Sequence, residues 1–183
     1  KKSKTRCLVF LQKEREIKPV LLCGNELPWV SSCKHLGNTI VTAVGGDIWH
    51  KDVMIKRAAV LDRNNDLRQE LRFAHPRTTS EVNKMQNSHF YGSILWNLSS
   101  KEVVKLEKSW NVSVRRMFDL PRESHCYLIE AVSDQLHVRT LLARRFLNFA
   151  NAIRTSSKHA LRSLLRVVEY DALSVTGRNL RSI

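Results

Sequence analysis

The stretch from Val20 to Ile40, VLLCGNELPWVSSCKHLGNTI, decides how the first part of the chain folds. It contains a short apolar run, a turn signal at Gly24-Asn25 and a second run that Pro28 interrupts. Because proline has no N–H to donate to a sheet ladder, Pro28 predicts an edge strand or a bulge. The triplet His35-Leu36-Gly37 begins a further expected strand over residues 35–43. The stretch therefore predicts a small layer of β-hairpins.

The sequence on either side extends this layer and then ends it. Upstream, residues 6–11 and 19–23 are apolar runs separated by charged residues, which predicts a hairpin with an exposed loop. A short strand is also expected over residues 26–30. Downstream, the glycine pair Gly45-Gly46 marks the end of the β region.

From Asp47 onward the apolar residues recur every three to four positions, which predicts helices. Asp47 is the expected cap of a first helix that ends near Phe73. Two capping boxes, Thr78-x-x-Glu81 and Ser99-x-x-Glu102, predict helices that end at Leu98 and at Phe118. Three further helices are expected over 124–132, from Ser133 or Asp134 to Thr155, and over 157–169. A loosely held tail is expected from Leu173.

These patterns predict an α+β fold that is mainly α. We expect the end of a β layer over residues 1–46, a helical bundle over 47–122, and a downstream helical segment with a basic tail over 123–183.

Positive charge is concentrated at the two ends of the chain. The 31 Lys and Arg against 17 Asp and Glu give a net charge of +14. Residues 1–18 carry seven basic and two acidic side chains, and residues 139–183 carry nine and two, whereas the 120 residues between them are nearly balanced. Such an excess favours a polyanionic partner, since neutralised phosphates release condensed counterions.

The four cysteines and the hydropathy pattern bear on location and metal binding. Cys7, Cys23, Cys33 and Cys126 have no paired C-x-x-C spacing, and the ten-residue interval between Cys23 and Cys33 is not that of a zinc knuckle. The sequence has no run of about 18 apolar residues, which is the length a membrane span needs. We therefore expect an intracellular protein, in the nucleus or cytoplasm, with reduced cysteines and no membrane partner.

The order of the motifs resembles the end of the palm, the thumb and the downstream helices of reverse transcriptases from non-LTR, LINE-type retrotransposons. In that family a lysine-serine segment, a hairpin with a proline and a "his-leu-gly" triplet occur in this order. The matching segments here are Lys2-Ser3, residues 20–40, the "tyr-gly-x-x-x-trp" of residues 88–96, the "leu-pro-arg" turn of residues 119–122 and residues 174–180.

The resemblance implies a role in holding an RNA template and a DNA primer as an RNA–DNA hybrid, together with an upstream palm and fingers of the same polypeptide. The family's aspartates that bind Mg²⁺ have no counterpart here, so the chain alone is expected to be inactive. The acids Asp47, Asp52, Asp62 and Asp66 are expected to face solvent as caps and i,i+4 partners of lysines and arginines.

Specific residues follow from the resemblance and from the charge pattern. By resemblance, His35, Leu36 and Gly37 seat the primer end, and Lys2 is the candidate general acid for the leaving pyrophosphate. The residues expected to contact the nucleic-acid backbone are Lys4, Arg6, Arg154, Lys158, Arg162 and Arg166, of which the last four would form a basic stripe if they share one helix. Tyr91 and Trp96 are expected to anchor the helical core.

Two other interpretations stay open at the level of sequence. One is a non-enzymatic, basic, helical nucleic-acid-binding module in which the β-hairpin is incidental. The other is an inactive relic of a decayed element. Salt-dependent duplex binding favours a binding function over a relic, and a preference for hybrid ends favours the reverse transcriptase.

Overall fold

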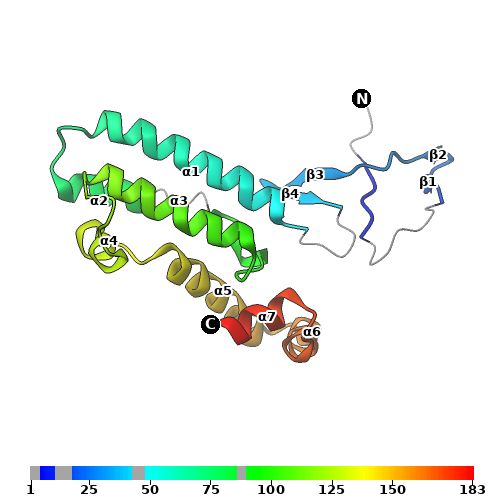
Figure 1. Cartoon of the computed structure of the whole chain (residues 1–183). Helices are drawn as coiled ribbons and strands as arrows, with labels where there is room; N and C mark the ends of the chain where they lie inside the picture. The colour runs from blue at the N-terminus through cyan, green and yellow to red at the C-terminus, as the bar shows by residue number, and fades with distance from the viewer. Residues whose placement is uncertain (1–4, 11–17, 43–47, 86–89) are drawn as a thin grey trace.

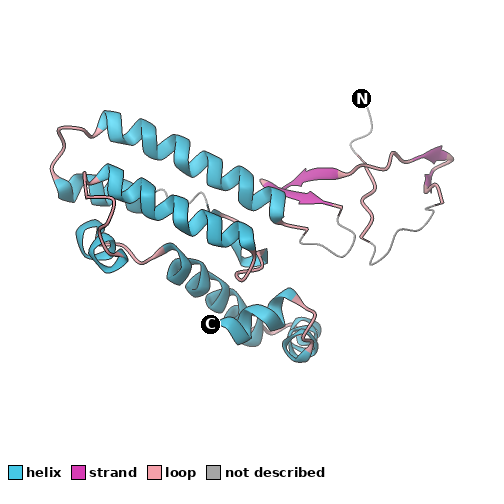
Figure 2. Ribbon diagram, viewed as in Figure 1, coloured by secondary structure: helices cyan, strands magenta, loops and turns pink. Residues whose placement is uncertain are grey.

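The computed structural model describes residues 5–10, 18–42, 48–85 and 90–183, and it confirms the mainly helical α+β fold (Figures 1 and 2). The expected roles of Lys2, Lys4, Gly45-Gly46 and Asp47 lie outside these described residues. Within them, no helix is both long and apolar enough to cross a membrane.

Two small antiparallel sheets precede the helices. One pairs β1 (Leu21–Leu22) with β2 (Asn25–Glu26), and the other pairs β3 (Ser32–His35) with β4 (Asn38–Val41). The expected pairing of residues 6–11 with 19–23 is wrong in the described part of the chain. Cys7 instead bridges to Trp29, and β1 turns back directly into β2.

The physical reason is the turn at Cys23-Gly24, one residue earlier than expected. Both residues have a positive φ, 51° and 79°, which is the combination that a two-residue hairpin turn with the correct twist requires. Closing this short loop costs less chain entropy than pairing strands across the longer charged segment.

Two long parallel helices carry the core. In Figure 1, α1 (His50–Glu70) lies beside α3 (Lys101–Met117). The two helices are also joined by hydrogen bonds from Arg57 to Ser109, 2.6 Å, and from Arg68 to Asp119, 3.1 Å. Buried apolar residues recur along the facing sides and pack with two aromatic rings from the connecting segment: Val53, Val60, Leu67, Val103, Leu106, Trp110, Val114, Phe90 and Trp96.

The second helix is much shorter than expected. Helix α2 (Pro76–Met85) starts at Pro76, which suits the first helical position because its missing N–H needs no partner there. Thr78 therefore lies inside the helix, and the expected capping box is wrong. The expected extension to Leu98 is also wrong, because Gly92 has a φ of 81° and a short 3₁₀ helix, η2 (Ser93–Leu95), follows it.

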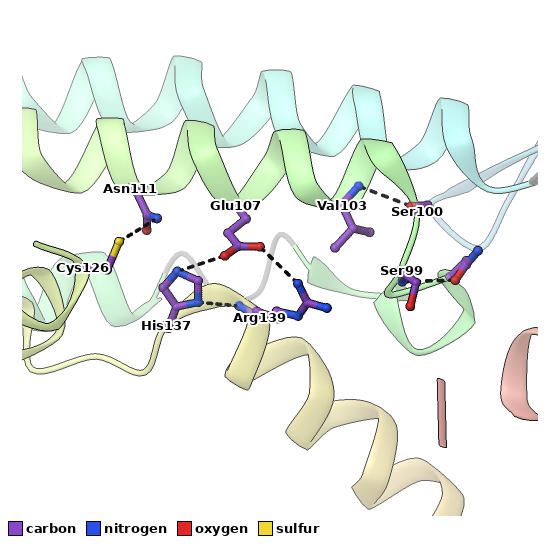
Figure 3. Close-up of polar contacts among 9 residues, drawn as sticks. Ser99, Ser100, Val103, Glu107, Asn111, Cys126, His137 and Arg139 are labelled. Carbon is purple, nitrogen blue, oxygen red and sulfur yellow. Dashed lines mark hydrogen bonds and ion pairs between the residues drawn. The ribbon is translucent and has the colours of Figure 1, made fainter. Parts of the chain in front are cut away.

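Two helix starts differ from the expected caps (Figure 3). The Oγ of Ser100, rather than that of Ser99, accepts the Val103 N–H at 3.3 Å and caps α3. After α4 (Cys126–Ser133), helix α5 (Val138–Arg154) is capped by His137 instead of Ser133 or Asp134. Asp134 has a φ of 49°, so it ends α4 in the left-handed region.

His137 joins α5 to α3. Its Nδ1 accepts the Arg139 N–H at 3.4 Å, and its Nε2 lies 3.6 Å from the carboxylate of Glu107 on α3. The other oxygen of Glu107 lies 3.8 Å from the Arg139 guanidinium, as Figure 3 shows. These contacts select His137 as the cap because they form only when α5 meets α3.

The C-terminal tail is helical, which corrects the expectation of a loose end. After α6 (His159–Tyr170), the Oγ of Ser174 accepts the Gly177 N–H at 2.8 Å and starts α7 (Val175–Ser182). A side chain at Gly177 would lie 2.4 Å from the Asp171 carbonyl oxygen, so the tight turn between α6 and α7 requires glycine.

Candidate nucleic-acid interface

The triplet His35-Leu36-Gly37 lies at the tip of the β3–β4 hairpin. His35 pairs with Asn38, and the two turn residues between them have positive φ values of 47° and 80°. The expected strand over 35–43 is therefore wrong for Leu36 and Gly37, where the chain reverses, and His35 ends β3 instead of starting the next strand. All three are exposed, and Leu36 keeps 71% of its surface exposed to solvent.

Gly37 is needed for its backbone conformation. A side chain added there would meet no atom within 4 Å, whereas a φ of 80° strongly favours glycine. Leu36 adopts the left-handed conformation at a steric cost and presents an apolar side chain to solvent. The tip is thus shaped to project, with Lys34 and His35 exposed beside it.

Asp52 on α1 anchors this hairpin close to its turn. Its carboxylate accepts the Thr39 N–H of β4 at 2.7 Å and the indole N–H of Trp96 at 3.0 Å, and it lies 3.4 Å from the Lys56 ammonium. Asp52 is 1% exposed, so the expectation that it faces solvent is wrong. A buried carboxylate is tolerated here because three donors converge on it from separate segments.

Lys56 extends this anchor to Asn38, the first residue after the turn. Its ammonium donates to the Asn38 side-chain oxygen at 2.6 Å and to the Tyr91 carbonyl oxygen, and it lies 5.8 Å from the centre of the Trp96 ring. Burial lowers the pKa of Lys56 below 10.5, the neighbouring Asp52 carboxylate opposes that change, and the positive charge of Lys34 adds to it. Lys34 therefore lies close enough for its field to reach this site.

Gly92 lets the connecting segment close over Asn38. A side chain at Gly92 would come within 2.1 Å of the Asn38 amide oxygen, and the φ of 81° also disfavours any other residue. Because Gly92 lies so close to Asn38, the start of β4 packs between α1 and the 90–96 segment. The hairpin is therefore held against the helical core while its tip stays exposed.

Asn179 on α7 braces the same connecting segment from the other side. Its side chain is fully buried, accepts the Leu98 N–H at 2.9 Å and donates to the Trp96 carbonyl oxygen at 2.8 Å. As expected, Trp96 anchors the core, with no exposed surface. Tyr91 does not, since it is 61% exposed.

The structure divides the expected basic stripe. Arg154 ends α5 and forms an ion pair of 2.7 Å with Glu169, which packs α6 against α5. Arg162 donates to the Ser156 carbonyl oxygen at 2.7 Å, whereas Lys158 and Arg166 are exposed. Lys158, just before α6, and Arg162 and Arg166 on α6 keep their four-residue spacing. Arg154 is separated from them because it pairs with Glu169 near the C-terminal end of α6.

The predicted site residues fall into two groups. In Figure 1 the hairpin tip stands beside the start of α1, and α6 lies beside α5 and α7. Arg6 is exposed next to Cys7, whose backbone pairs with Trp29. No group of three or more His, Cys, Asp or Glu with the geometry of a metal site occurs among the described residues.

The i,i+4 spacing predicts the pairing of Asp52 with Lys56, which the structure confirms. Sequence reasoning missed its burial and its contact with Asn38, because this spacing does not distinguish an exposed pair from a buried one. Comparison of the chain with protein-family models, curated proteins and solved structures finds no match. The family resemblance accordingly depends on the sequence motifs alone.

Proposed function

We propose that this chain forms the end of the palm, the thumb and the downstream helices of a non-LTR retrotransposon reverse transcriptase, and that it holds the template–primer hybrid. The observation that carries the proposal is the exposed His35-Leu36-Gly37 tip on a hairpin that buried Asp52 anchors through Thr39, two residues after Gly37. A group that seats a primer end has to be both accessible and fixed in orientation.

The charge distribution supports a phosphate-backbone partner. The net charge is +14, and Lys34, Lys158 and Arg166 are exposed. Contacts to phosphates carry no base sequence information, so binding is expected to be independent of nucleotide sequence. In the proposed enzyme, Mg²⁺ would be held by palm aspartates that have no counterpart in this chain. An intracellular location follows from this partner.

The test is binding of the whole chain to an RNA–DNA hybrid with a recessed DNA 3′ end, measured by fluorescence anisotropy. We expect log K to fall linearly with log salt concentration, with a slope of about −0.9 for each phosphate contacted, as known for B-form duplexes. A competing blunt hybrid of the same length should bind less tightly than the recessed one. Equal affinity for both would favour the non-enzymatic binding module, and absence of binding would refute both.

A matched pair of double variants locates the end preference. His35→Ala with Leu36→Ala should abolish the preference for the recessed end, because both side chains of the tip are truncated while the buried Asp52 and Lys56 are unchanged. Phe73→Ala with His75→Ala also removes one histidine and one large apolar side chain, here at an exposed connection where Phe73 is 93% exposed, and should preserve the preference. Equal effects of the two double variants would contradict the proposed role of the tip.

A further inference from the structure

Three arginines share one pocket at the C-terminal end of α3. Arg115, Arg116 and Arg122 line a cavity of about 380 Å³ together with Val112 and Leu120. We call this set the arginine pocket. In Figure 1 the end of α3 that carries it lies away from the β3–β4 hairpin, at the opposite end of the α1–α3 pair.

The arginines differ in how far they are already engaged. The Nε and Nη2 atoms of Arg115 donate to the Ser124 carbonyl oxygen at 3.0 and 2.6 Å, which fixes the plane of its guanidinium. Arg116 and Arg122 are exposed, and neither makes a hydrogen bond or ion pair with another described residue. Two guanidinium groups and part of a third are thus available to a ligand.

The negative charges near the arginine pocket are too few to neutralise its three arginines. The end of α3 carries about half a negative charge from its dipole, which one arginine more than offsets. The nearby Asp119 carboxylate lies 3.1 Å from Arg68 and is engaged there. Glu123 is exposed and adds one negative charge beside Arg122. The pocket therefore keeps an excess of positive charge.

Guanidinium groups around a cavity suit a tetrahedral oxyanion. Each planar fork can donate two parallel hydrogen bonds to phosphate oxygens, and such charge-assisted bonds are stronger than neutral ones. The aliphatic side chains of Val112 and Leu120 on the same cavity exclude water from one side, which strengthens the attraction. We propose that the arginine pocket is a phosphate-binding site, separate from the proposed primer contact at the hairpin.

The first experiment titrates the whole chain with inorganic phosphate and follows the arginine Nε–H signals by NMR. Saturable shifts are expected, and Arg116→Gln and Arg122→Gln should each weaken binding about tenfold or more, as for other hydrogen bonds to charged groups. Arg115 is left intact because its contact with Ser124 supports the turn. The control is Arg63→Gln, an exposed arginine on α1, which should change affinity less than about twofold.

A second experiment identifies the source of the phosphate. The chain is titrated with one oligonucleotide in two forms, with a 5′-phosphate and with a 5′-hydroxyl. A preference for the phosphorylated form that Arg116→Gln removes would assign a terminal phosphate. Equal affinity for both forms, lowered by Arg116→Gln but not by Arg63→Gln, would assign a backbone phosphate.

Two results would overturn the proposal. One is a phosphate titration that does not saturate, and the other is an equal loss of affinity in Arg63→Gln and Arg116→Gln. Neither result bears on the end preference tested with the His35 and Leu36 variants, so failure of the arginine pocket and failure of the proposed primer contact are separate outcomes.

Discussion

Replacing Asp52 with alanine tests whether the buried carboxylate holds the hairpin on the helical core. The carboxylate accepts the Thr39 N–H at 2.7 Å and the Trp96 indole N–H at 3.0 Å, and it pairs with the Lys56 ammonium at 3.4 Å. Asp52→Ala would leave two donors and one cation without this acceptor. The Asp52→Asn variant would keep one acceptor oxygen and remove the charge.

The expected loss follows from how deeply each group is buried. Removing one partner of a buried ion pair costs about 3–5 kcal/mol, mostly because the other charge stays buried. The Lys56 side chain keeps 12% of its surface exposed, and its ammonium also donates to the Asn38 side-chain oxygen at 2.6 Å. We therefore expect about 3 kcal/mol for Asp52→Ala, at the lower end of that range, and about 2 kcal/mol for Asp52→Asn.

The measurement is urea-induced unfolding, followed by tryptophan fluorescence and far-UV circular dichroism. The matched control is Asp66→Ala, an exposed acid on the same helix, which should change the free energy of unfolding by less than about 0.5 kcal/mol. Amide exchange at Thr39 should accelerate in Asp52→Ala because its hydrogen-bond acceptor is lost. A stability within about 0.5 kcal/mol of the Asp66→Ala control would refute the reasoning.

Three further predictions concern the segments packed around this anchor. Gly92→Ala should destabilise the chain by about 2 kcal/mol or more, because it combines a left-handed backbone with overpacking against Asn38. Asn179→Ala should release α7, seen as faster amide exchange over 175–182, since the Trp96 carbonyl oxygen loses its buried donor. Burial lowers the pKa of Lys56 in the folded chain below 10.5. Between this lowered pKa and 10.5, the unfolded chain therefore binds more protons than the folded chain. The stability of the native chain relative to Lys56→Met should therefore rise with pH through that interval, as measured by urea midpoints.

Each of these has a control or a contradicting outcome. Gly37→Ala has the same backbone strain without any atom within 4 Å, so it should cost only about 1–2 kcal/mol, and an equal cost at Gly92 would reject overpacking. Arg178→Ala, an exposed neighbour on α7, should leave amide exchange unchanged. A stability difference between the native chain and Lys56→Met that falls with rising pH would contradict the sign given for Lys56.

The local sequence predicts which segments are helical, but it predicts less well where each helix begins and ends. The apolar spacing predicts α1 and α3 closely, since both bury a continuous stripe that recurs along the helix. The expected second helix runs through Gly92, whereas α2 ends at Met85 and the left-handed backbone of Gly92 excludes a continuous helix there. His137 became a cap through its contact with Glu107, which lies 30 positions earlier on another helix. Such caps depend on tertiary packing.

The candidate site shows the same division. The triplet His35-Leu36-Gly37 was identified from sequence, and a turn with two positive φ values explains why the glycine is there. Its position at a hairpin tip was not predicted, because apolar alternation alone does not distinguish a continuing strand from a reversal. The pairing of Arg154 with Glu169 was also missed, since it required α6 to fold back on α5.

The sequence by itself determined the mainly helical class, the positive charge and the residues that make up the hairpin. These features depend on composition and on spacing over a few positions, which act within one element. Only the tertiary structure decided that Asp52 and Asn179 are buried. A polar side chain can be buried only where its partners meet it, and here those partners come from segments 13 to 83 residues away along the chain.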